Sequence, residues 1–103
     1  MGRKEQCDNI DRMSKILLER QEILDKLESV LDELDEKNDE FQAIKEYFSS
    51  EQRMKDIDAD EKGEIPESIN RAALTQDELY NMLEDNHDVA VHMIESAAGI
   101  LKL

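Results

Sequence analysis

Residues 10–48 read IDRMSKILLERQEILDKLESVLDELDEKNDEFQAIKEYF. Apolar residues recur in this stretch at every seventh position, in two main stripes and a third that flanks them. The first stripe is Ile10, Leu17, Leu24 and Leu31, the second is Met13, Leu27, Leu34, Phe41 and Phe48, and the third is Ile16, Ile23, Val30 and Ile44. A seven-residue repeat places each stripe on one face of an α-helix, and a face this wide must be covered by another helix.

Residues 8–48 contain neither glycine nor proline, and they are rich in the helix formers Leu, Glu, Lys and Ile. We therefore expect one long N-terminal helix over residues 8–48. The stripes become polar in the charged run 35–40, around Asn38. That run could be a turn between two helices, but we interpret it as a solvated break in a continuous helix, because Asn38 is its only strong turn residue.

The middle of the chain predicts a short helix followed by a connector. Ser49 is a candidate N-cap for a helix over residues 50–60, with Met54 and Ile57 facing inward. A glycine and a proline then interrupt the helix-forming composition. We expect residues 61–75 to form an irregular connector that contains a further helical turn or two.

A capping box predicts where the last helix begins. Thr75 and Glu78 occupy its two positions, so we expect a long C-terminal helix over residues 76–101. Its inward positions step by four and three residues: Leu79, Leu83, Asn86, Ala90, Met93, Ala97 and Ile100. No segment has the alternation of a β-strand, and the fold class expected is all-α.

The lengths of the helices suggest how they are covered. The stripes over residues 10–48 would span roughly 57 Å in an unbroken helix, whereas residues 79–101 span about 33 Å. The C-terminal helix therefore cannot cover the N-terminal one. We expect a single domain over residues 1–103, packed as an antiparallel helical bundle, and favour a homodimer over a monomer. Arg20 and Asn86 interrupt the apolar stripes; such residues can fix register or partner number, or lie at an edge in contact with water.

The charge excludes several classes of partner. The chain has 27 acidic and 13 basic residues, a net charge of −14, with no basic patch to bind phosphates. We expect no direct binding of DNA or RNA, and none of an anionic membrane. Cys7 is the only cysteine, the first residues lack the apolar core of a signal peptide, and no apolar run approaches ~20 residues. These features favour a cytoplasmic protein.

The acidic segment after residue 55 invites comparison with the calcium-binding EF-hand loop. A frame that starts at Asp56 places Glu67 at position twelve, but Glu61 stands where the loop needs glycine. A frame that starts at Asp58 restores that glycine, but Ile69 then replaces the bidentate glutamate. Each frame satisfies half of the rule, so we interpret the segment as a solvated helix end and expect no metal site.

Catalytic chemistry has no clear support in the sequence. Glu84 and His87 have the spacing that di-iron bundles use, but His92 has no glutamate three residues before it, so the second motif is missing. Cys7 precedes the first expected helix, and no serine lies in a glycine elbow. We expect a protein that is not an enzyme and holds no cofactor.

Several blocks of the sequence, in their order, resemble a known family. The blocks are Glu46-Tyr47-Phe48-Ser49-Ser50-Glu51, Asp58-Ala59-Asp60-Glu61 with Gly63 and Pro66, Leu74-Thr75-Gln76-Asp77-Glu78-Leu79-Tyr80-Asn81, and Glu84-Asp85-Asn86. Together with the Leu-rich helix before them, they resemble the short bacterial proteins grouped as domain of unknown function 4298. The resemblance implies a small helical bacterial protein with no assigned activity. It also implies that the acidic segment before Gly63 is the family's own pattern.

The leading functional hypothesis is a protein–protein interaction module, an adaptor or regulator with an unidentified protein partner, that presents helical faces. Its candidate contact residues are Leu24, Leu27, Leu31, Leu34, Phe41 and Tyr47. The alternative is an acidic mimic of nucleic acid, such as a phage-encoded anti-defence inhibitor of a DNA- or RNA-binding protein. Its candidate surface is Asp56, Asp58, Asp60, Glu61, Glu84, Asp85 and Asp88.

Overall fold

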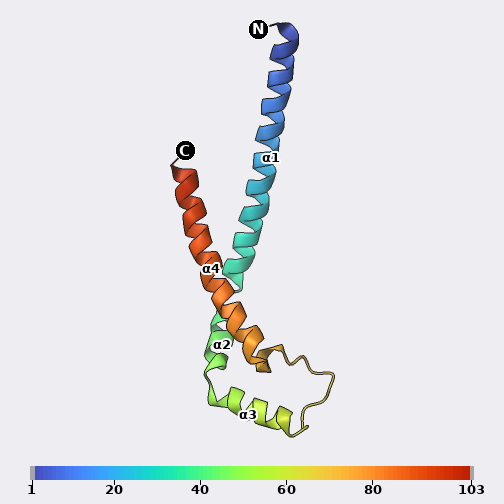
Figure 1. The fold of residues 1–103 in the computed structure, drawn as a ribbon, viewed down its shortest axis with the longest axis vertical. Helices are drawn as coiled ribbons and strands as arrows, with labels where there is room; N and C mark the ends of the chain where they lie inside the picture. Colours follow the sequence, from blue (N-terminus) through green and yellow to red (C-terminus); the bar gives the residue numbers. More distant parts are fainter. Residues whose placement is uncertain (1, 103) are drawn as a thin grey trace. The chain divides into compact units, whose positions relative to one another are not determined.

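The structure, a computed structural model, describes residues 2–102, and all regular structure within them is helical. The helices are α1 (Arg3–Glu36), α2 (Asn38–Phe48), α3 (Glu51–Glu61), the 3-10 helix η1 (Ala72–Leu74) and α4 (Gln76–Leu101) (Figure 1). The all-α prediction is confirmed. The chain divides into two compact units, residues 1–39 and residues 40–103.

The prediction of one continuous helix over residues 8–48 is wrong at Lys37. α1 begins five residues earlier than expected, at Arg3, and Cys7 therefore lies within it. Lys37 ends α1 with φ −93° and ψ 5°, and α2 begins at the next residue. Charge explains the interruption: acidic side chains stabilise the start of a helix and destabilise its end, and Asp39 and Glu40 stand in the first turn of α2.

α3 begins one residue later than predicted, and a different serine caps it. The Oγ atom of Ser50 accepts a hydrogen bond from the backbone N–H of Arg53 at 3.1 Å, whereas Ser49 lies in the preceding turn. The inward face also differs from the prediction, since Met54 is exposed and Ile57 only partly covered. Arg53 takes the buried position of α3.

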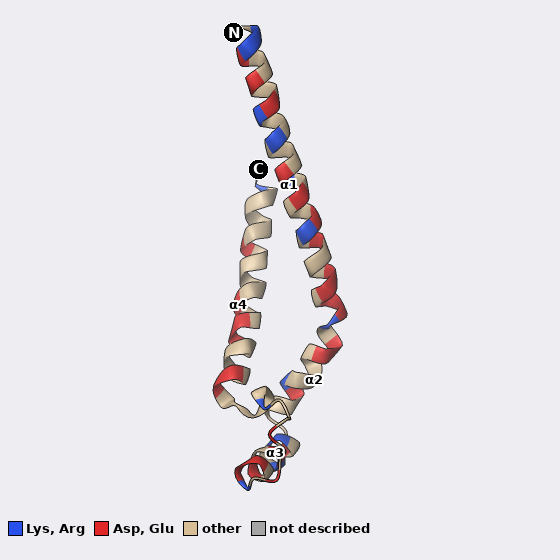
Figure 2. Cartoon of the chain, turned by 90° about the vertical axis from the view of Figure 1, so that its right-hand side faces the viewer, with Lys and Arg blue, Asp and Glu red and all other residues tan. Residues whose placement is uncertain are grey.

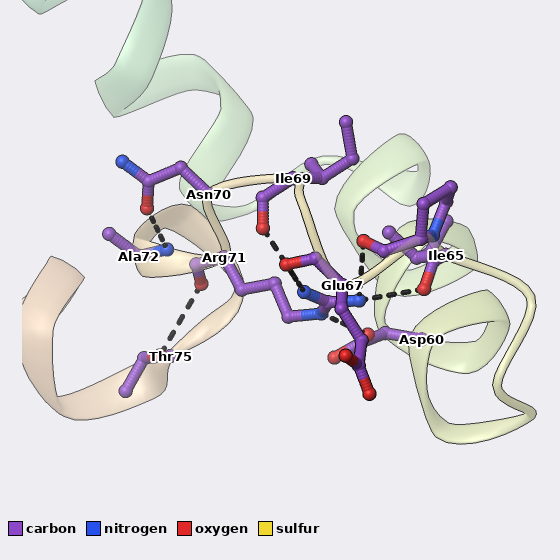
Figure 3. Close-up of polar contacts among 9 residues, drawn as sticks. Asp60, Ile65, Glu67, Ile69, Asn70, Arg71, Ala72 and Thr75 are labelled. Carbon is purple, nitrogen blue, oxygen red and sulfur yellow. Dashed lines mark hydrogen bonds and ion pairs between the residues drawn. The ribbon is translucent and has the colours of Figure 1, made fainter.

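The connector between α3 and η1 is ordered around one arginine. Arg71 forms an ion pair with Asp60 of α3 at 2.6 Å. Its two Nη atoms donate to four backbone carbonyls of the connector, those of Ile65, Pro66, Glu67 and Ile69 (Figure 3). Gly63 starts the connector with φ +74°, a conformation that residues with a side chain rarely adopt.

α4 covers Gln76–Leu101, directly after Thr75. The side-chain bond expected of the capping box is not formed, and the Thr75 hydroxyl instead donates to the carbonyl of Arg71 at 3.4 Å. Leu79, with 4% of its surface exposed, is the one buried apolar residue among those that the structure describes. The residues predicted to face inward become more exposed toward the end of the helix, where Met93 and Ile100 are exposed.

Candidate interaction surface

The most extended apolar surface lies along α1. Ten residues at the positions of the seven-residue repeat form it, and we call them the α1 seam: Ile10, Met13, Ile16, Leu17, Ile23, Leu24, Leu27, Val30, Leu31 and Leu34. Nine of them keep 41–65% of their surface exposed, and Leu31 is partly covered. They share one face because two turns of helix take about seven residues. Four of the six predicted contact residues belong to this seam.

The exposed apolar residues of α1 include one outside the seam. Leu18 follows Leu17 in the sequence, and both side chains are 65% exposed. One residue along a helix turns the side chain by about 100°, which places Leu18 about 160° from the middle of the seam. The two leucines therefore match in chemistry and exposure but differ in the face that they occupy.

Charge is distributed unevenly along α1. Residues 3–20 carry five basic and four acidic side chains, a net charge of +1. Residues 21–36 carry one basic and seven acidic side chains, a net charge of −6. Figure 2 shows this difference as acidic ribbon that dominates the part of α1 next to α2. One half of α1 is thus nearly neutral and the other half is strongly acidic. This difference in charge affects the direction in which a second helix can lie beside α1.

The other two predicted contact residues, Phe41 and Tyr47, lie on α2 in the second unit and are partly covered. Tyr47 is not a free anchor, because its hydroxyl donates to a carboxylate oxygen of Asp56 at 2.5 Å. Partial burial raises the pKa of Tyr47, and the bond to Asp56 raises it further. The same bond, with a second from the Gln52 amide at 2.8 Å, lowers the pKa of Asp56.

Three carboxylates of the predicted acidic surface on α3 have partners within the chain. Asp56 accepts from Tyr47, Asp58 pairs with Lys62 at 2.8 Å, and Asp60 pairs with Arg71. The remaining members of that predicted surface are exposed: Glu61, Glu84, Asp85 and Asp88. Each carboxylate that binds within the chain is less available to imitate a phosphate.

No cluster of three or more His, Cys, Asp or Glu side chains that could hold a metal ion occurs within residues 2–102. His87 lies 3.4 Å from Asp88, and both side chains are about three-quarters exposed. In the same part of the chain, no helix combines the length and the apolar character needed to cross a membrane.

Two arginines that sequence reasoning missed organise the second unit. Arg53 is 5% exposed, and its guanidinium carbon lies 5.3 Å above the centre of the Phe48 ring. Its Nε atom donates to the carbonyl of Ala73 at 3.1 Å, and Nη2 lies 3.5 Å from that of Leu74. Arg71, whose side chain is 29% exposed, binds the carbonyls of the connector and the carboxylate of Asp60. For Arg53, the only signal in the sequence is a basic residue within an acidic helix. That signal does not indicate that the side chain is buried.

An open groove of about 390 Å³ lies where α2, η1 and α4 meet. Its lining is Ile44, Asn70, Ala72, Ala73, Glu78, Leu79 and Met82. Five of these seven side chains are apolar, and no nucleophile with an adjacent base stands among them.

A family model described as Domain of unknown function (DUF4298) matches residues 10–96. The chain belongs to this family. The resemblance drawn from the sequence blocks is thus confirmed. No curated protein and no solved structure matches the chain.

The DUF4298 match includes the whole of the α1 seam, which begins at Ile10, and extends through α2, α3 and most of α4. Both units of the chain thus fall within the family. DUF4298 brings no assigned activity, so any function must be argued from the residues of this chain.

Proposed function

We propose that this DUF4298 chain is a non-enzymatic protein–protein interaction module, an adaptor or regulator that binds through the α1 seam and associates with itself. One observation carries the proposal: nine of the ten seam residues are exposed along a single face of a 34-residue helix. Monomeric proteins rarely leave so long an apolar stripe in water, and such stripes mark interaction sites.

Packing of helices is the natural way to cover such a stripe. Burial of apolar surface contributes roughly 25 cal/mol per Å², and a face with a seven-residue repeat buries best against another helix. The proposal therefore includes antiparallel packing of the helices into a bundle. The acidic exterior supports it further, because a net charge of −14 keeps an otherwise apolar helix from non-specific aggregation. The single cysteine is consistent with action in the cytoplasm.

The alternative function, a mimic of nucleic acid, has less support. It needs carboxylates that are free to face a basic groove, and Asp56, Asp58 and Asp60 are bound within the chain. The exposed acids of α4 are what remains of that surface. The two functions differ in their response to salt, because an ionic interface weakens steeply as salt is added and an apolar one does not.

A binding experiment with matched variants tests the proposal. The tagged wild-type chain, Leu17→Asp and Leu18→Asp are immobilised and exposed to the purified untagged chain and to a lysate of the source cells, at low and high salt. We expect the wild type and Leu18→Asp to retain protein at both salt concentrations and Leu17→Asp to retain little. Equal retention by the wild type and both variants would contradict the proposal. Retention lost in high salt and unaffected by Leu17→Asp would favour the mimic.

A further inference from the structure

We propose that α1 pairs antiparallel with α1 of a second copy of this chain, in a register that sets Leu17 opposite Leu27 of the other copy. The inference rests on the proposed function and specifies its partner and geometry. It comes from three features of α1: the central stripes of the seam, the residues on its two flanks, and the distribution of charge. Each of them favours the antiparallel over the parallel arrangement.

The apolar layers of the seam match when the second helix is reversed. Residues 10–34 span about 36 Å and three and a half repeats, which is enough for a helical pair. In the antiparallel register the opposed residues form four kinds of layer: Ile10 with Leu34, Met13 with Leu31, Leu17 with Leu27, and Arg20 with Leu24. Every layer has at least one aliphatic side chain, and the whole stripe is covered.

Arg20 is the residue that separates the two orientations. In a parallel pair in register, Arg20 would face Arg20 of the other copy within the seam. Two like charges held together in a partly dry interface are unfavourable, because neither has a partner for its charge. In the antiparallel pair each Arg20 lies against Leu24, and its long stem can cover the leucine while the guanidinium reaches water.

The residues on the two flanks of the seam also favour the antiparallel pair. In the antiparallel pair one flank joins Ile16 to Val30 and Ile23 to Ile23 of the second copy, and all of these contacts are apolar. The opposite flank joins Gln21 to Gln21. A parallel pair would instead place Ile23 against Glu28, which covers an apolar side chain with a charged one. The apolar third stripe is thus used fully only when the helices are antiparallel.

The charge of α1 provides the third argument. Antiparallel pairing places residues 3–20, with a net charge of +1, beside residues 21–36 of the second copy, with a net charge of −6. Parallel pairing would bring together two halves of net charge −6. Complementary charge across an interface selects orientation and rejects the wrong arrangement.

Cysteine cross-linking tests the orientation. Cys7, the only cysteine, is replaced by Ser, and single cysteines are placed at Met13 or Ile23 and treated with a short bismaleimide. In the antiparallel pair Ile23→Cys opposes itself and forms a covalent dimer. Met13→Cys then lies about 27 Å from its own copy and does not, but it cross-links when mixed with Leu31→Cys. Circular dichroism of each variant confirms that helix content is unchanged.

The result expected is at least tenfold more covalent dimer from Ile23→Cys than from Met13→Cys. The reverse ratio would overturn the inference and leave the proposed function intact, because a parallel pair still uses the seam. Absence of any cross-link in every combination, while Leu17→Asp still abolishes capture of another protein, would also overturn the inference alone. Capture that is insensitive to Leu17→Asp would contradict the proposed function itself.

Discussion

The Nε atom of Arg53 donates to the carbonyl oxygen of Ala73 at 3.1 Å, and this bond joins α3 to η1 across twenty residues of chain. The guanidinium also stacks on the ring of Phe48, at the end of α2. One buried arginine thus links three helical elements of the second unit. A charge can be buried here because carbonyl oxygens and an aromatic face replace the water it loses.

Replacement of Arg53 should therefore destabilise the second unit. We expect Arg53→Met to lower the free energy of unfolding by about 2 kcal/mol, from unpaired carbonyls and the lost contact with the ring. Urea unfolding followed by circular dichroism measures the change. The neighbouring Met54→Ala, at a residue that is 70% exposed, is the matched control and should change stability by less than about 0.5 kcal/mol. Equal effects of the two substitutions would contradict the role assigned to Arg53.

Arg71 should control the order of the connector. Lysine keeps the charge but cannot reach several carbonyls at once, so Arg71→Lys should loosen the connector while the helices persist. We expect a glutamate-specific protease to cleave after Glu64 and Glu67 about tenfold faster, equivalent to about 1.4 kcal/mol of local stability. Lys62→Gln removes only the exposed pair with Asp58 and should leave the rate unchanged. Unchanged cleavage of Arg71→Lys would show that its hydrogen bonds do not hold the connector.

The pair of Tyr47 and Asp56 should make stability depend on pH at both extremes. The pKa of Asp56 is lowered on folding, so its contribution is complete above the usual value of 3.8 and is lost as the pH falls through the lowered pKa. The pKa of Tyr47 is raised, so its contribution is complete below 10.0 and is lost as the pH rises through the raised pKa.

Tyr47→Phe should consequently lower the midpoint of thermal unfolding by a few degrees at neutral pH, and the difference from the wild type should shrink in acid and in alkali. Calorimetry across the pH range provides the measurement. Tyr80→Phe is the control, because Tyr80 is half exposed and lies on α4. A difference that stays constant with pH would indicate that the bond between the hydroxyl and the carboxylate contributes nothing.

Arg20 should weaken the dimer and at the same time select its antiparallel orientation. In the proposed register Arg20→Leu converts two layers into leucine pairs, so we expect the dissociation constant of the dimer to fall more than tenfold, or about 1.4 kcal/mol. It should also permit some parallel pairing, seen as new cross-linking of Met13→Cys with itself. Lys15→Leu makes the same change of charge on the opposite face and should not tighten the dimer. Similar tightening by both variants would point to net charge rather than the seam.

Much of the helical content could be predicted from the sequence, because it depends on local spacing. The repeat that starts at Ile10 predicts a helix, and Thr75 marks the residue before α4. The end of α1 at Lys37 was harder to predict, since a charged run is compatible with either a helix or a turn. Local composition alone does not distinguish them.

The features that could not be predicted from the sequence depend on contacts between residues far apart in the chain. Burial of Arg53 requires the carbonyls of η1, twenty residues away, and nothing around Arg53 in the sequence reveals where they lie. The engagement of Asp56 by Tyr47 similarly requires the turn between α2 and α3. The α1 seam was predictable because it is a repeat within one helix, and such a repeat needs no knowledge of the rest of the chain.

The most direct test of the α1 seam as the surface that binds a second copy is the mass of the chain in solution, measured by sedimentation equilibrium. The wild type, Leu17→Asp and Leu18→Asp are compared at the same concentrations, because the two leucines have equal exposure on different faces. We expect the wild type and Leu18→Asp to sediment at twice the 12.0 kDa of one chain and Leu17→Asp at 12.0 kDa. A wild type of 12.0 kDa at all concentrations, or a Leu17→Asp variant that keeps the doubled mass, would contradict the account.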